Sequence, residues 1–168
     1  MRRVLFNINI PQQVLRRLLS LVATFLVAIS PVSAGDSILD LEDYQGKVVI
    51  VDFWASWCVP CRRSFPWLDE MQKKYAADGL VVVGVNMDAD QADANGFLQA
   101  HPVGFRIVQD PDGMLARRYD VIAMPSSYVI DRSGEIVARH LGFKVARQQE
   151  YEATLLSVLQ ETTERQAQ

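Results

Sequence analysis

The chain has 168 residues, and 49% of them are hydrophobic, a content typical of a globular domain that excludes an intrinsically disordered chain. Its formal net charge of −3 argues against a nucleic-acid partner, since that function requires a basic surface. The chain has only two cysteines, Cys58 and Cys61. A bridge between them closes a very short loop and adds little stability, so the pair is of interest for its chemistry.

The N-terminus has the pattern of a secretory signal. Residues 1–34 contain four arginines and no acidic residue, and an apolar run at 18–29 is followed by small residues that end at Ala34. We therefore predict a signal peptide that is cut after Ala34 and an exported, periplasmic protein. The apolar run is shorter than the roughly 20 residues of a spanning helix. An uncleaved inner-membrane anchor stays open as the alternative, because the charged region is long.

Residues 35–168 are predicted to form one domain. The segments 47–55 and 80–87 are nearly continuous apolar runs, which are typical of strands buried on both faces. Between them, residues 59–77 are predicted to form a helix. Pro60 falls in its first turn, where a missing backbone N–H costs nothing.

The second half of the domain repeats this alternation. Helices are predicted over 89–100, 112–119 and 147–163, and strands over 104–109, 126–131 and 135–140. The last two strands are joined by Arg132-Ser133-Gly134, a hairpin turn. The order of elements predicts an α/β fold with a mixed sheet and helices on both of its faces.

The motif Cys58-Val59-Pro60-Cys61 lies where a buried strand gives way to a helix. A thiolate is the attacking species in disulfide exchange, and the N–H groups and partial positive charge of a helix N-terminus stabilise it. We expect Cys58 to be the exposed nucleophile and Cys61, one turn inside, to be the resolving thiol. Their redox-active disulfide needs no further cofactor.

The two intervening residues predict the direction of the reaction. A helix dipole contributes roughly 0.3–2 kcal/mol, which lowers a thiol pKa by about one unit. A strongly oxidising site needs a shift of about five units. Val59 and Pro60 add neither charge nor a side-chain donor, so the motif favours a reductant of disulfides.

Two segments resemble a known family. Residues 51–61, VDFWASWCVPC, resemble thioredoxin, and residues 124–137, MPSSYVIDRSGEIV, look like the exported TlpA/ResA branch. The resemblance covers roughly residues 38–160. It implies a thioredoxin-like fold with a strand–helix insertion at about 88–110, and a thiol–disulfide oxidoreductase.

The resemblance also implies roles for particular residues. The Met124–Pro125 peptide bond is expected to be cis, with Pro125 packed against the cysteine pair. The backbone of Met124 would then bind an extended substrate segment by strand addition. Trp57 is expected to shield the disulfide and contact partners, whereas Trp54 is assigned equally well to binding or to packing.

Asp52 stands at the position of the buried aspartate of thioredoxin. Burial would raise its pKa and let it accept the proton of Cys61 through water. The alternative is an ordinary strand-end aspartate that is solvated or hydrogen-bonded. The chain departs from its relatives at two positions, with Gly84 in place of the lysine of thioredoxin and Ser64 in place of the glutamate of ResA-type reductants.

The leading functional hypothesis is a monomeric reductant of protein disulfides, with a role in cytochrome c maturation. Such an enzyme needs a membrane thiol donor for its own re-reduction, because exported compartments are oxidising. Two alternatives stay open. One is a thiol peroxidase of the redoxin type. The other is a metal carrier, although a CxxC supplies only two of the usual four zinc ligands, and the only histidines, His101 and His140, lie far apart in the sequence.

Overall fold

The computed structural model describes residues 39–166, and the side chains of residues 39–160. The expected signal segment 1–34 lies outside the described residues. The strands are β1 (Val48–Trp54), β2 (Leu80–Asn86), β3 (Arg106–Gln109), β4 (Ser126–Ile130) and β5 (Ile136–Leu141). The helices are α2 (Val59–Tyr75), α3 (Gln91–Ala100), α4 (Met114–Arg118) and α5 (Gln148–Gln166), with the short 3-10 helices η1 (Leu41–Tyr44) and η2 (Val145–Arg147).

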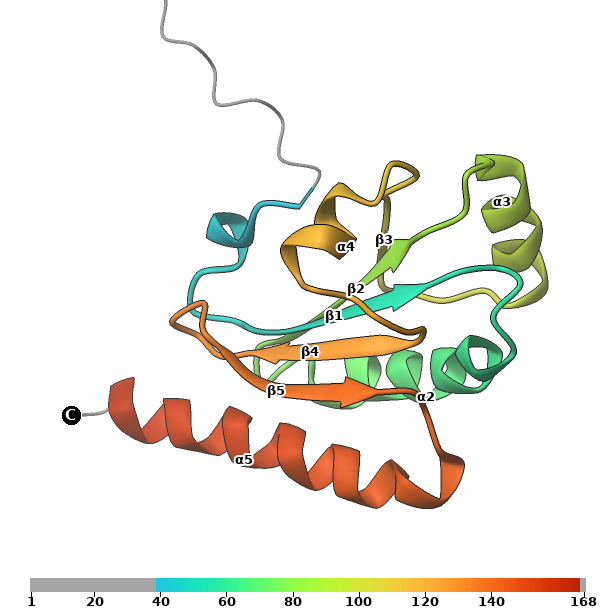
Figure 1. The fold of residues 1–168 in the computed structure, drawn as a ribbon. Coiled ribbons are helices and arrows are strands. Elements are labelled where there is room, and N and C mark those ends of the chain that lie inside the picture. The colour runs from blue at the N-terminus through green and yellow to red at the C-terminus, as the bar shows by residue number, and fades with distance from the viewer. Residues whose placement is uncertain (1–38, 167–168) are drawn as a thin grey trace, which may run out of the picture. The chain divides into compact units, whose positions relative to one another are not determined.

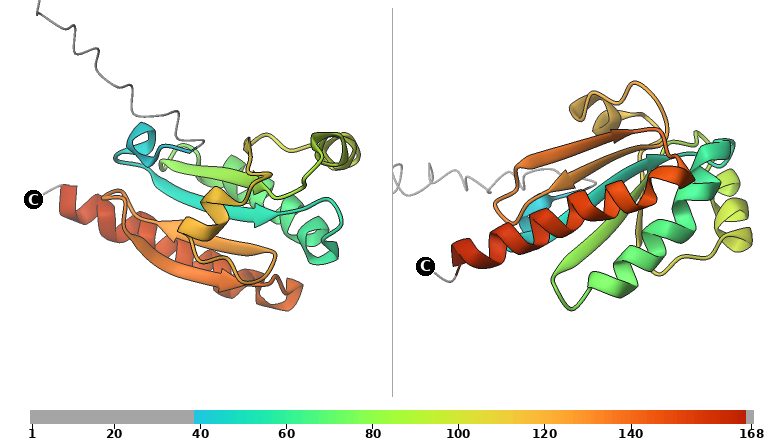
Figure 2. Two further views of the ribbon diagram at one scale, coloured as in Figure 1. Left: turned by 45° about the horizontal axis from the view of Figure 1, so that its top comes forward. Right: turned by 90° about the horizontal axis from the view of Figure 1, so that it is seen from below.

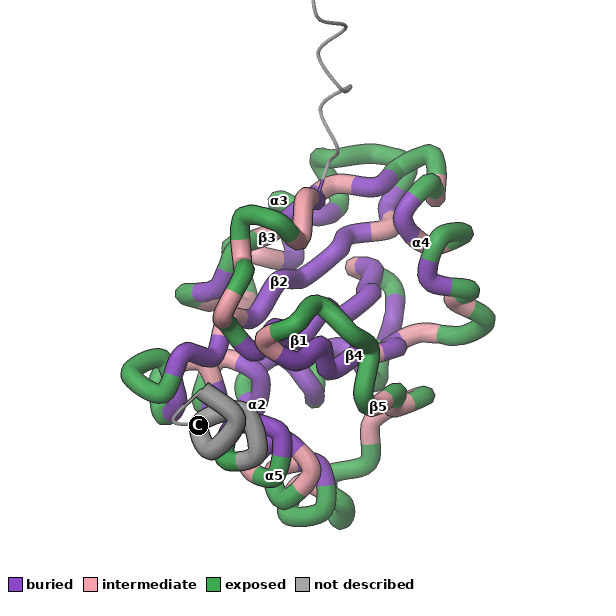
Figure 3. Tube along the Cα trace, turned by 90° about the vertical axis from the view of Figure 1, so that its left-hand side faces the viewer, coloured by how far each residue is buried: buried purple, intermediate pink, exposed green. Residues whose placement is uncertain are grey.

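The strands form one mixed sheet in the order β3-β2-β1-β4-β5. β1 pairs in parallel with β2 and antiparallel with β4, while β3 continues the parallel half and β5 the antiparallel half. Every residue of the central strand β1 is buried, whereas the edge strand β5 is largely exposed (Figure 3). The predicted mixed sheet is therefore confirmed.

The alternation of side chains along β1 divides the core into two layers. Val48, Ile50 and Trp54 face one layer, which is filled by α2, α3 and α5. Val49, Val51 and Phe53 face the other, which is covered by η1 and α4. Figure 1 shows α2 and α5 beneath the sheet and α4 above it, which confirms helices on both faces.

Helices α2 and α5 lie side by side on the same face of the sheet (Figure 2). The carboxylate of Glu152 on α5 accepts hydrogen bonds from Tyr75 and, at 2.6 Å, from the Lys74 ammonium, both on α2. The rings of Trp67 and Tyr151 also meet across this interface, with centroids 6.0 Å apart. These contacts attach the last helix to the helix that carries the cysteines.

Two elements begin later than predicted, because a side-chain carboxylate accepts a backbone N–H near the start of each. The helix α3 begins at Gln91 because Asp90 accepts the backbone N–H of Ala92. The third strand begins at Arg106, since the N–H of Gly104 is bound by the carboxylate of Asp69 on α2 rather than by the sheet. The helices η1 and η2 were not predicted, because elements of three or four residues have no measurable periodicity.

Within residues 39–166, none of the helices combines the length and the apolar character that a membrane span requires.

Candidate active site

Cys58 and Cys61 form a disulfide at the N-terminus of α2. Their sulfur atoms are 2.04 Å apart and their Cα atoms 5.3 Å apart. Cys58 is the N-cap of the helix, and its Sγ accepts the backbone N–H of Cys61 at 3.3 Å. The same N–H also donates to the backbone carbonyl of Cys58 at 3.1 Å, so it is shared between two acceptors. The first turn of the helix therefore places an N–H at the sulfur of Cys58, which is the arrangement that stabilises a thiolate.

Cys58 is far less exposed than expected. Cys58 has 4% of its surface accessible and Cys61 has none, so the prediction of an exposed Cys58 is wrong for this disulfide form. The neighbouring Trp57, by contrast, is 65% exposed. A groove of about 390 Å³ opens beside it, lined by Ser56, Trp57, Arg62, Asp93, Phe97, Ala100 and His101. The surface next to the disulfide thus offers an aromatic ring.

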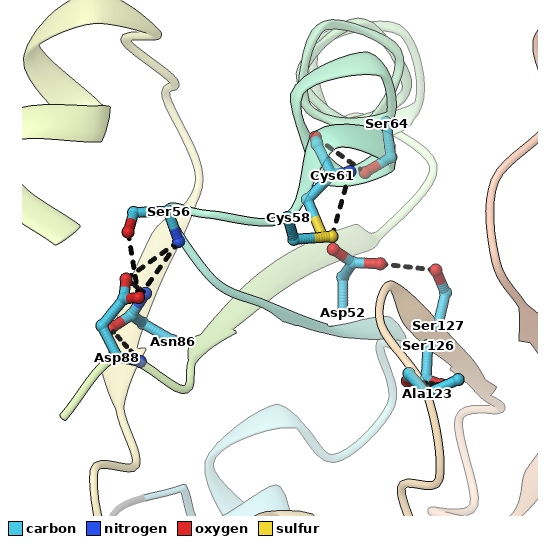
Figure 4. The surroundings of a disulfide bond; sticks show 10 residues. All are labelled: Asp52, Ser56, Cys58, Cys61, Ser64, Asn86, Asp88, Ala123, Ser126 and Ser127. Carbon is cyan, nitrogen blue, oxygen red and sulfur yellow. Dashed lines mark hydrogen bonds between the residues drawn. A yellow bond between two sulfur atoms is a disulfide. The ribbon is translucent and has the colours of Figure 1, made fainter. Parts of the chain in front are cut away.

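The loop before Cys58 is fixed by Asp88, which lies just beyond β2 (Figure 4). Both oxygens of its carboxylate accept the backbone N–H of Ser56, at 3.0 and 3.2 Å, and one also accepts the Ser56 hydroxyl at 3.0 Å. Asn86 donates to the same carboxylate at 2.8 Å. The role of Asp88 was not predicted from the sequence. The available signal was its place after the carboxyl end of a parallel strand, where functional groups of α/β sheets gather.

Asp52 lies on β1 beneath the disulfide (Figure 4) and has no accessible surface. Its Oδ1 accepts the hydroxyl of Ser127 on β4 at 2.6 Å, and its Oδ2 has no protein partner. Burial raises the pKa of Asp52 to about 7, and the hydrogen bond from Ser127 opposes that rise. The solvated interpretation of Asp52 is therefore wrong, and its carboxyl can exchange a proton near neutral pH.

Gly84 on β2 is the register neighbour of Asp52. A Cβ at this position would lie 3.0 Å from side-chain carbons of Phe105 and Ile107, and 3.1 Å from Nε1 of Trp54. The space beside Asp52 is thus filled by apolar side chains and has no room for a lysine. Trp54 itself is completely buried, with its ring centroid 4.7 Å from that of Phe65, so its role is packing and not binding.

The Met124–Pro125 peptide bond is cis, as the resemblance implies. Pro125 is buried, and its carbonyl accepts the N–H of Gly142 at 2.8 Å, which ties it to the end of β5. Met124 is partly buried against the core layer that contains both cysteines. The hydroxyl of Ser64 donates to the carbonyl of Cys61 at 3.1 Å, so Ser64 does not take over the role of an acidic residue.

The two histidines lie against aromatic rings. His101 is 4.6 Å from Phe97 and His140 is 4.7 Å from Tyr151, measured between ring centroids. Among the described side chains, no three His, Cys, Asp or Glu residues form a group that could hold a metal ion.

Comparison with known proteins agrees with this geometry. A family model described as Redoxin matches residues 28–155. The thiol-disulfide oxidoreductase ResA of Bacillus thuringiensis subsp. konkukian is 29% identical over 112 residues, which are 67% of this chain and 65% of that protein. The match thus spans slightly less than two thirds of the length of ResA. The thioredoxin-like protein YneN of Bacillus subtilis is 35% identical over 118 residues, or 68% of each chain.

Solved structures share the fold. A Chlorobium tepidum protein assigned as the thiol:disulfide interchange protein DsbE is 47% identical, with a TM-score of 0.70, over 72% of this chain and 86% of that one. StoA of Bacillus subtilis is 30% identical, with a TM-score of 0.56, over 64% and 82% of the two chains. The chain therefore belongs to the redoxin family, with a thioredoxin-like fold of the TlpA/ResA type.

Proposed function

We propose that this protein is an exported thiol–disulfide oxidoreductase that reduces disulfides in partner proteins. The observation that carries the proposal is the Cys58–Cys61 pair at the N-terminus of α2, directly above the buried carboxyl of Asp52. The names of ResA and of the DsbE-assigned relative, which describe thiol–disulfide exchange, support it.

In the proposed mechanism the protein starts as a dithiol. The Cys58 thiolate attacks one sulfur of a partner disulfide, which forms a mixed disulfide and releases a partner thiolate. Cys61 then loses its proton, through a water molecule, to the carboxylate of Asp52, and its thiolate attacks the sulfur of Cys58. The second partner thiolate leaves, and the Cys58–Cys61 disulfide remains. Two electrons have passed from the protein to the partner.

The binding surface follows from the same geometry. The exposed ring of Trp57 would contact the partner, and the backbone of Met124 before the cis-proline would pair with an extended segment of it. The protein would act as a monomer. Its disulfide must be reduced after each turnover, and we assign that step to a membrane thiol donor, because exported compartments are kept oxidising.

Within this class we propose a narrower substrate. Haem is attached to c-type cytochromes at a Cys-x-x-Cys-His segment whose cysteines must be reduced. An oxidised segment of this kind offers a short-loop disulfide to Cys58, and the chain that flanks it would pair with the backbone of Met124. Apocytochrome c is therefore our candidate partner.

A trapping experiment tests the function. The reduced Cys61→Ser variant is mixed with an oxidised peptide that contains Cys-x-x-Cys-His. We expect a stable mixed disulfide on Cys58, since the resolving thiol is missing, and turnover at least a hundredfold below that of the unmodified protein. The matched Cys58→Ser variant should form no adduct. Adduct on neither variant, with peroxide consumed instead, would replace the proposal with a thiol peroxidase.

A further inference from the structure

A row of polar residues crosses the sheet beneath the disulfide. Asp52 on β1 pairs in register with Ser127 on β4, and Ser127 pairs with His140 on β5. Side chains opposite each other in antiparallel strands share a face, so all three point into the layer that contains the cysteines. In the other direction the neighbour of Asp52 is Gly84, which contributes no side chain.

The two carboxylate oxygens of Asp52 differ in their surroundings. Ser127 donates its hydroxyl to Oδ1 at 2.6 Å, while Oδ2 has no protein partner. Figure 4 shows one oxygen directed at Ser127 and the other directed at the disulfide. The hydrogen bond at Oδ1 restricts rotation of the carboxyl group. Oδ2 therefore stays directed at the sulfurs.

We propose that Ser127 is the positioning residue of this site, because its hydroxyl holds Oδ1 of Asp52 and leaves Oδ2 to receive the proton of Cys61. The inference rests on the proposed function, in which Asp52 serves the resolving thiol. The hydroxyl of Ser127 donates to Asp52, and in this proposal it acts through that carboxylate. It supplies the polar contact that a lysine cannot supply here, since the space beside Gly84 is filled.

The charged groups around the row are few. Cys58 and Cys61 lie above Asp52 (Figure 4), and as a disulfide they do not titrate. The strand β2 carries no titratable side chain. His140 lies one strand beyond Ser127, and its pKa is lowered by burial and then by Arg147. Arg147 in turn is paired with Glu150 at the start of α5, and Tyr151 stacks on His140. Ser127 is therefore the one side chain, among those described, that donates a hydrogen bond to the Asp52 carboxylate.

The test compares Ser127→Thr with Ser127→Val. The two replacements have the same shape and both suit a strand, so they differ only in the hydroxyl. The pKa of Asp52 is followed by carbon NMR of its carboxyl in the oxidised protein. Loss of a hydrogen bond to a charged group should raise that pKa by about one to two units in Ser127→Val, while Ser127→Thr stays near the unmodified value.

A second readout is the pH profile of disulfide reduction. A rise of about one unit from a pKa near 7 leaves about one tenth of Asp52 ionised at pH 7, so the rate of Ser127→Val should fall about fivefold there and recover at higher pH. Ser126→Ala is the control, because the Ser126 hydroxyl donates to the carbonyl of Ala123 and not to Asp52. It should leave the Asp52 pKa unchanged.

The outcomes separate the two proposals. An Asp52 pKa that is the same in Ser127→Val and Ser127→Thr overturns the role of Ser127, whatever the activity. The titration uses the oxidised protein and needs no turnover. A shifted pKa in a protein that never reduces a disulfide would therefore refute the proposed function and leave the contact from Ser127 to Asp52 intact.

Discussion

At the scale of single residues, Asp52 couples the chemistry of the site to the stability of the fold. Its pKa is about 7 in the folded protein, against about 4 in an unfolded chain. The folded state therefore holds a proton that the unfolded state has lost between these values, and stability must fall as pH rises through this window. The same ionisation that provides a base for Cys61 places a charge in the core.

This cost predicts the effect of Asp52→Asn on unfolding by urea. In the unmodified oxidised protein, Asp52 should remove about 3 kcal/mol of stability between pH 5 and pH 8. Asparagine cannot ionise, so the variant should lack this loss and be the more stable of the two at pH 8. Equal pH dependence in both proteins would mean that Asp52 titrates near its ordinary pKa.

At the scale of elements, the attachment of α5 to α2 depends on Glu152, which accepts from Tyr75 and Lys74. Glu152→Gln weakens both contacts at a partly buried position, and we expect a loss of about 1 kcal/mol in the free energy of unfolding. Glu150→Gln is the matched control. The pair that Glu150 makes with Arg147 is local and exposed, so its loss should be close to zero.

A result in which both variants lose the same amount would contradict this assignment. The contacts of Glu152 would then contribute no more to the free energy of unfolding than an exposed ion pair does. The packing of α5 against α2 would depend on apolar contacts alone. Chemical denaturation at one pH and one salt concentration distinguishes these cases, since surface pairs are screened by salt.

The longer strands and helices of this fold were predictable because they have strong local patterns, whereas η1 and η2 were too short to have one. The apolar runs of β1 and β2 and the CxxC at the start of α2 can be recognised within a few residues. The first residues of α3 and β3 could not be predicted from periodicity, because they are set by the side chains of Asp90 and Asp69.

Site residues that lie close together in the sequence were predictable. Contacts between residues far apart in the sequence were not. The cysteines were recognised from their own stretch of chain, whereas Asp52 and the cis bond before Pro125 came from the family resemblance. Asp88 and Ser127 were missed as partners because their contacts, to Ser56 and Asp52, join residues that are 32 and 75 positions apart in the sequence. The burial of Cys58 likewise depends on packing against elements that are distant in the sequence.

At the scale of the whole molecule, the direction of the reaction is linked to stability. A folded protein that stabilises its thiolate favours the reduced form, as a strong oxidant does. The sulfur of Cys58 receives an N–H from Cys61, and Val59 and Pro60 add no further side-chain donor. We therefore expect the oxidised form to be at least as stable as the reduced form.

Two measurements check this expectation. The potential of the Cys58–Cys61 couple, equilibrated against dithiothreitol, should lie near −250 mV or below, and each 30 mV corresponds to about 1.4 kcal/mol. Urea midpoints of the oxidised and reduced protein should follow the same order. A potential near −120 mV together with a more stable reduced form would make the protein an oxidant.

The hydrogen bonds from Ser56 to the carboxylate of Asp88 also protect this loop from proteolysis. Trp57 exposes the kind of side chain that chymotrypsin-like proteases select, but such enzymes bind their substrates as extended strands. Here the N–H of Ser56 is held by a carboxylate, the N–H of Cys58 donates to the carbonyl of Ala55, and the disulfide closes the next turn. The segment can therefore present its aromatic ring to a redox partner while its backbone is withheld from a cleavage site.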